Sequence, residues 1–132
     1  MQNIILHSYA GSRSIAKSLC KLAGAQVYFS FAQIRNQRAE EVIEFIPEDK
    51  ILVETDSPHQ LDMENLIANS DGELQKSSFF QNKNKSLDLN FLNDPSMVRI
   101  TLKRMAKIRG TNWKNLAFQI YRNSLMATKL II

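Results

Sequence analysis

The sequence has 132 residues, which is enough for one domain with a buried core. A hydrophobic content of 44% and a charged content of 23% are those of a soluble globular protein. The formal net charge of +4 suits a polyanionic substrate, although so modest a balance identifies no ligand by itself. A single cysteine, Cys20, excludes disulfides and thiolate zinc clusters within the chain, and its apolar neighbours indicate a small buried residue.

No run of about 18 apolar residues is present, so the sequence predicts no transmembrane helix. The N-terminus also lacks a charged segment followed by an apolar one, the pattern of a signal peptide. We therefore expect a cytoplasmic or nuclear protein that does not bind a membrane.

Three short apolar runs in the first half of the chain predict β-strands at residues 3–7, 26–31 and 51–55. A helix is expected between each pair of strands, the first capped by Ser12 and the second ended by Pro47. Strands that alternate with helices predict a parallel sheet and an α/β fold. The apolar stripes of the two helices are Ile15, Leu19 and Leu22, and Ala39, Val42, Ile43 and Ile46.

Residues 60–92 interrupt this pattern, because they are polar and poor in apolar residues. They predict a long loop insertion that is at least partly disordered. A helix is expected after it, with Asp94 as its cap, Pro95 at its first position and Gly110 at its end. A final helix begins at residue 111 or 112. The expected buried residues of these two helices are Val98, Leu102, Met105 and Ala106, and Trp113, Leu116, Ala117, Ile120 and Tyr121.

His7 and Asp56 are the candidate site residues, because each follows an apolar strand and the two strands end on the same side of a parallel sheet. Taken singly, His7 is also explained as a half-buried, hydrogen-bonded residue, and Asp56 as the cap of a short turn before Pro58. Taken together, an imidazole and a carboxylate suit zinc or manganese. A metal site normally needs at least three protein ligands, so these two residues predict only part of one.

Other polar residues are interpreted as structural. Glu54 is a second-shell group or, as we favour, an exterior salt-bridge partner, and His59 is expected to be exposed. Four basic residues could contact phosphates, but a solvated charged surface is the preferred interpretation. The sequence contains no glycine-rich phosphate loop and no nucleophile elbow. The four basic residues are Lys83, Lys85, Lys103 and Arg104.

The order of several short motifs resembles the C-terminal half of the TatD-related metal-dependent deoxyribonucleases. The segment 54–58, Glu-Thr-Asp-Ser-Pro, matches the Glu-Thr-Asp-(Ser/Ala)-Pro signature of that family. The segment 7–12 resembles its His-Cys-Phe-Ser-Gly strand end, and the segment 28–31 its Tyr-Ile-Ser-Phe-Ser strand. The remaining matches are Ile46-Pro47, Asn93-Asp94-Pro95, Arg109-Gly110 and Asn123.

The resemblance implies a metal-dependent hydrolase of the TIM-type β/α barrel that cleaves phosphodiester bonds in DNA. This chain would supply the last three strands and the C-terminal helices, about three strands of eight. The resemblance assigns metal ligation to His7 and Asp56, with Asp56 also catalytic, and divalent Mg, Mn or Zn as the cofactor. The family's other ligands, a His-x-His pair, a glutamate and an earlier histidine, have no counterpart here.

These departures lead to two expectations for the chain by itself. It should be nearly inactive, because two residues are too few to hold two divalent ions. It should also be poorly folded, because the inward face of its sheet would lack the layers that pack against it. The residues expected on that face are Ile4, Leu6, Val27, Phe29, Leu52 and Val53. The alternative function is that of a truncated or degenerate relative that acts as a non-catalytic interaction module.

Overall fold

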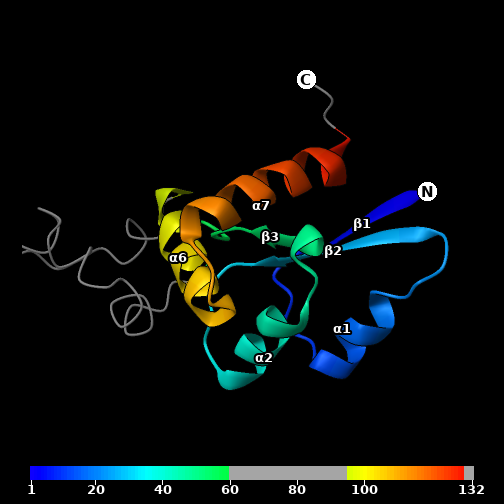
Figure 1. The fold of residues 1–132 in the computed structure, drawn as a ribbon, viewed down its shortest axis with the longest axis horizontal. Coiled ribbons are helices and arrows are strands. Elements are labelled where there is room, and N and C mark those ends of the chain that lie inside the picture. The colour runs from blue at the N-terminus through cyan, green and yellow to red at the C-terminus, as the bar shows by residue number, and fades with distance from the viewer. Residues whose placement is uncertain (60–94, 130–132) are drawn as a thin grey trace, which may run out of the picture.

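The computed structural model describes residues 1–59 and 95–129, so the predicted insertion at 60–92 lies outside the described residues. A three-stranded sheet lies at the centre, with helices on both of its faces (Figure 1). In chain order the elements are β1 (Gln2–Leu6), α1 (Arg13–Leu19), β2 (Ala25–Phe31), α2 (Gln37–Phe45), the 3₁₀ turn η1 (Glu48–Lys50), β3 (Ile51–Val53), the 3₁₀ turn η3 (Pro95–Met97), α6 (Val98–Arg109) and α7 (Trp113–Thr128).

The strands are parallel and lie in the order β1-β2-β3, which confirms the predicted α/β class and the parallel sheet. Ile4 pairs with Val27, and Phe29 pairs with Ile51. The third strand ends two residues earlier than predicted, at Val53. The N–H of Glu54 still donates to the carbonyl of Phe31 at 2.9 Å, but no further strand pairing follows.

The two faces of the sheet carry different partners. Helices α1 and α2 cover one face, and α7 lies over the other (Figure 1). Val27, Phe29 and Ile51 belong to the main apolar core, together with residues of α1, α2, α6 and α7. Tyr28 and Leu52 point to the opposite face, because side chains alternate along a strand, and they form a second cluster with Ala127 of α7.

The expectation that the sheet would lack packing partners is wrong for the part that the structure describes. Val27 and Phe29 are buried in the main core, and Leu52 is buried against α7. Ile4, Leu6 and Val53 are partly buried and pack on the main core. The expectation placed Leu52 and Val53 on the same face, whereas neighbouring residues of a strand point to opposite faces.

The helix ends follow from their capping residues. The hydroxyl of Ser12 accepts a hydrogen bond from the N–H of Ile15 at 3.4 Å, so the predicted cap of α1 is confirmed. Gly110 ends α6 with a φ of 64°, a left-handed conformation that glycine adopts without steric cost. The predicted cap Asp94 lies outside the described residues. Pro95 begins η3 instead of α6.

Three of the predicted apolar stripe positions are wrong. Ile15 and Leu22 are exposed, because α1 ends at Leu19 and turns Ala16 toward the core instead. Tyr121 of α7 is exposed as well. The stripes of α2 and α6 are confirmed at Val42, Ile43, Ile46, Leu102, Met105 and Ala106.

Side-chain hydrogen bonds to backbone carbonyls hold α7 to the sheet and α6 to α2. Asn123 of α7 is buried, and its amide donates to the carbonyls of Glu48 and Ile51, both at 2.8 Å. The guanidinium of Arg109 at the end of α6 donates to the carbonyls of Ile43 and Ile46 at 2.6 and 2.8 Å. Carbonyls near a helix end and a strand start have few backbone donors, so these side chains complete their hydrogen bonding.

No helix in the described part of the chain has the length and hydropathy needed to cross a membrane.

Candidate functional site

His7, Glu54 and Asp56 come together at the carboxyl ends of β1 and β3. The Nε2 atom of His7 lies 3.4 Å from Oε1 of Glu54 and 3.6 Å from Oδ1 of Asp56. The predicted proximity of His7 and Asp56 is therefore confirmed, whereas their role as ligands stays a prediction. The side chain of His7 is 65% exposed, so its ring is accessible from solvent.

Glu54 connects the ends of all three strands. Its Oε1 atom accepts a hydrogen bond from the N–H of Ser8 at 2.7 Å, and its Oε2 atom accepts one from the hydroxyl of Ser30. The preferred interpretation placed Glu54 in a salt bridge at the exterior, and that placement is wrong, because the Glu54 side chain is only 17% exposed and faces His7 at the strand ends. Ser30 is the residue in the sequence that could have indicated this role of Glu54. It is a hydroxyl residue inside the apolar run of β2, and it pairs with Leu52 of β3. Because side chains alternate along a strand, Ser30, Leu52 and Glu54 lie on the same face.

The loops at these strand ends turn through left-handed backbone conformations. Ser8 has a φ of 49° and Asp56 a φ of 54°. Such values cost a residue other than glycine about 1–3 kcal/mol, and they cluster at functional sites. Asp56 is among the residue types that tolerate this conformation best. The turn brings the Asp56 carboxylate across the end of β2 toward His7, at the end of β1.

The donor set fits part of a metal site. An imidazole nitrogen and a carboxylate oxygen are ligands for zinc or manganese, and His7 and Asp56 supply one each. Both oxygens of Glu54 already accept hydrogen bonds from the protein. Within residues 1–59 and 95–129, no group of three or more His, Cys, Asp or Glu side chains could hold a metal ion. His59 is exposed in the loop that follows, as predicted.

Tyr9 forms a fixed wall beside the strand ends. Its ring lies edge-on to Phe29, with 5.0 Å between ring centroids, and its hydroxyl donates to the carbonyl of Ser12 at 3.1 Å. Burial, and secondly the nearby Cys20, raises the pKa of Tyr9 above its usual 10.0, so the phenol stays neutral at physiological pH. A Cβ atom on Gly11 would come within 2.4 Å of the Tyr9 oxygen, so glycine leaves the space that the ring occupies.

Two solved structures share this fold. One is described as a hydrolase TatD family protein from Entamoeba histolytica, with a TM-score of 0.65 and 14% identity. The other is an uncharacterized amidohydrolase from Saccharomyces cerevisiae, with a TM-score of 0.72 and 15% identity. The matches cover 93% and 95% of this chain but only 41% and 40% of those chains, so the chain spans about two fifths of their length.

The sequence itself matches the family model described as TatD related DNase over residues 1–129, which is nearly its whole length. No curated protein sequence matches it. A family match of this extent, together with the shared fold and the predicted motifs, leads to one conclusion: the chain belongs to the TatD-related DNase family.

Proposed function

We propose that the chain contributes to a metal-dependent hydrolase that cleaves phosphodiester bonds in DNA. The observation that carries the proposal is the distance of 3.6 Å between the His7 and Asp56 side chains at the carboxyl ends of β1 and β3. Membership of a family described as TatD related DNase supports the choice of substrate. In β/α barrels, catalytic side chains lie at the carboxyl ends of the strands, which is where this pair lies.

In this proposal His7 and Asp56 are metal ligands, and Asp56 also orients the attacking water. These residues would help to hold a divalent ion, which when bound would supply Lewis acidity toward a phosphoryl oxygen and activate water. Glu54 is a positioning residue. Through Ser8 it holds the backbone next to His7, and through Ser30 it fixes the middle strand relative to both ends.

The proposal includes a barrel in which β1, β2 and β3 are the last three strands. Pairing with further strands would use the two outer edges of the sheet, and the other half of the barrel would supply the remaining metal ligands. A chain that supplies only two ligands is expected to have little nuclease activity by itself. The rival proposal, a non-catalytic interaction module, predicts no role for His7 in metal binding.

The experiment is a calorimetric titration of the 132-residue chain with Mn²⁺ and with Zn²⁺. His7→Ala and Asp56→Asn should each weaken binding at least about tenfold, the scale on which loss of groups around a metal reduces affinity. His59→Ala is the matched control, because His59 is also an exposed imidazole near the strand ends. Equal losses in His7→Ala and His59→Ala, or unchanged binding in His7→Ala, would refute the proposed metal site.

A further inference from the structure

We propose that a cavity beside the strand ends binds a phosphate group of the DNA backbone, next to the phosphodiester that is cleaved. Arg35 and Arg38 are its cationic ligands. The inference rests on the proposed function and adds to it a subsite that holds the polynucleotide through a second phosphate.

The cavity lies beside the candidate site, on the α2 side of the strand ends. It has a volume of about 140 Å³ and lies between the loop that follows β1, the loop that follows β2 and the first turn of α2. Ser8 and Phe31 are among its lining residues. The backbones of both residues also hydrogen-bond Glu54, Ser8 through its N–H and Phe31 through its carbonyl, so two lining residues of the cavity are partners of the candidate site.

The chemistry of the lining suits an anion. Arg35 and Arg38 contribute two guanidinium groups, and Gln33 and Asn36 contribute amides. Acidic side chains are absent from the described residues around the cavity. A guanidinium presents paired N–H donors that match two oxygens of one phosphate. Glu54 and Asp56 lie beside this positive cavity. The cation of the proposed metal site and the phosphate of the proposed subsite would therefore bind at separate, neighbouring positions.

The walls keep the cavity open. Tyr9 lines it and is held on both sides, by the ring contact to Phe29 and by the hydrogen bond from its hydroxyl to Ser12. Val42, which is fully buried, forms part of the opposite wall on α2. Since Tyr9 and Val42 are both held by packing against the core, the walls of the cavity are fixed.

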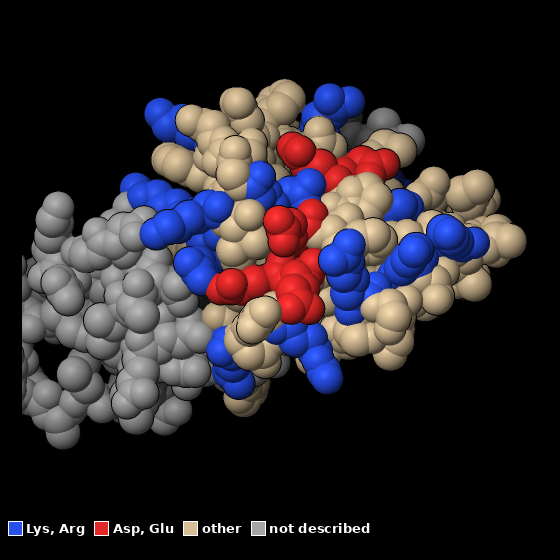
Figure 2. All heavy atoms as spheres, turned by 60° about the horizontal axis from the view of Figure 1, so that its bottom comes forward, with Lys and Arg blue, Asp and Glu red and all other residues tan. Residues whose placement is uncertain are grey.

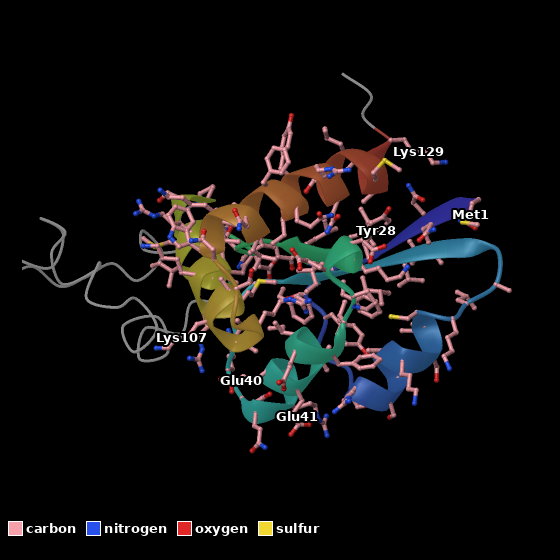
Figure 3. The ribbon with its side chains drawn as sticks, in the orientation of Figure 1. Met1, Tyr28, Glu40, Glu41, Lys107 and Lys129 are labelled. Carbon is pink, nitrogen blue, oxygen red and sulfur yellow. The ribbon has the colours of Figure 1, made fainter. Side chains whose placement is uncertain are left out.

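Other hollows on the described surface suit a polyanion less well. The groove between α2 and α6 contains three glutamates, of which Glu40 and Glu41 are labelled in Figure 3 opposite Lys107. Figure 2 shows the acidic side chains gathered in the middle of this face, with basic side chains around them. A larger hollow between α7 and the sheet, near Met1 and Lys129 in Figure 3, includes Asp49.

The test measures phosphate binding without metal, so that it does not depend on hydrolysis. The ¹⁵N-labelled full chain in EDTA is titrated with inorganic phosphate and then with a short oligothymidylate, and amide shifts are followed. Amides of residues 8–11 and 33–38 should shift with both probes. The double variant Arg35→Gln/Arg38→Gln should weaken oligothymidylate binding about tenfold or more. This loss is larger than the loss expected from removing two positive charges elsewhere on the surface.

Arg99→Gln/Arg122→Gln is the matched control, because it removes the same charge from α6 and α7, and it should weaken binding by less than about threefold. Equal losses in the two double variants, or shifts that avoid the cavity, would overturn the inference. Thermal unfolding checks that both variants fold. His7→Ala should still bind oligothymidylate in EDTA, so a failed metal site and a failed phosphate site give different results.

Discussion

Replacing Asn123 with alanine tests how α7 is held to the sheet. The Asn123 amide donates two hydrogen bonds of 2.8 Å, to the carbonyls of Glu48 and Ile51, and its side-chain oxygen accepts one from Gln119 at 2.8 Å. Only 3% of the residue is exposed. Alanine removes the side-chain amide, so the carbonyls of Glu48 and Ile51 lose the N–H groups that Asn123 donates to them.

The expected loss follows from those two donors. Each hydrogen bond contributes about 1 kcal/mol net, and a buried carbonyl that loses its partner costs about 1–3 kcal/mol. The Ile51 carbonyl is the more deeply buried of the two, so most of the cost falls there. A total of about 2–4 kcal/mol is expected, which is a large part of the 5–15 kcal/mol that stabilises a typical domain.

The assay is urea unfolding followed by circular dichroism, with Asn115→Ala as the control. Asn115 lies on the same helix and is exposed, so both variants gain the same helix propensity from alanine. The difference between their free energies of unfolding isolates the hydrogen bonds to η1 and β3. A difference below about 1 kcal/mol would refute the reasoning, because it would be less than a single net hydrogen bond.

Two further changes test the end of α6 and the ionisation of the half-buried Tyr9 phenol. Gly110→Ala should destabilise the chain by about 1 kcal/mol, because alanine is strained at a φ of 64° although no atom blocks its Cβ; an unchanged midpoint in thermal unfolding would contradict this. Burial raises the pKa of Tyr9 above 10.0, so its contribution to stability is fully present below pH 10 and is lost as the pH rises through the raised value. Tyr9→Phe should therefore lose stability less steeply than the parent above pH 10 in alkaline denaturation, and parallel curves would show that Tyr9 does not couple ionisation to folding.

The order of elements and the meeting of His7 with Asp56 could be predicted because both depend on local signals. Apolar runs and capping residues mark where strands and helices begin and end, and parallel strands place their carboxyl ends at one edge. The role of Glu54 could not be predicted in this way. Its partners, Ser8 and Ser30, are set by how β1, β2 and β3 align, and the sequence does not state that register.

The exact placement of the helices on the sheet could not be predicted from the sequence either. A stripe predicts that a helix has a buried side, but a helix as short as α1 can turn by one residue. Ala16 then replaces Ile15 in the core. The apolar pattern of α7 also does not indicate which face of the sheet this helix covers. That choice depends on contacts far apart in the sequence, such as the amide of Asn3 donating to the carbonyls of Met126 and Ala127.

This contact between Asn3 and the end of α7 has a consequence for the order of folding. It joins residues separated by 123 and 124 positions, so the entropy of closing that long loop must be lost before the bond contributes. The contacts among β1, β2 and β3 span far shorter stretches of chain. We therefore expect the strands to assemble first and α7 to dock late. His7, Glu54 and Asp56 would then reach their positions before the last helix arrives, and a detached α7 would expose Tyr28 and Leu52 while those three side chains stay together.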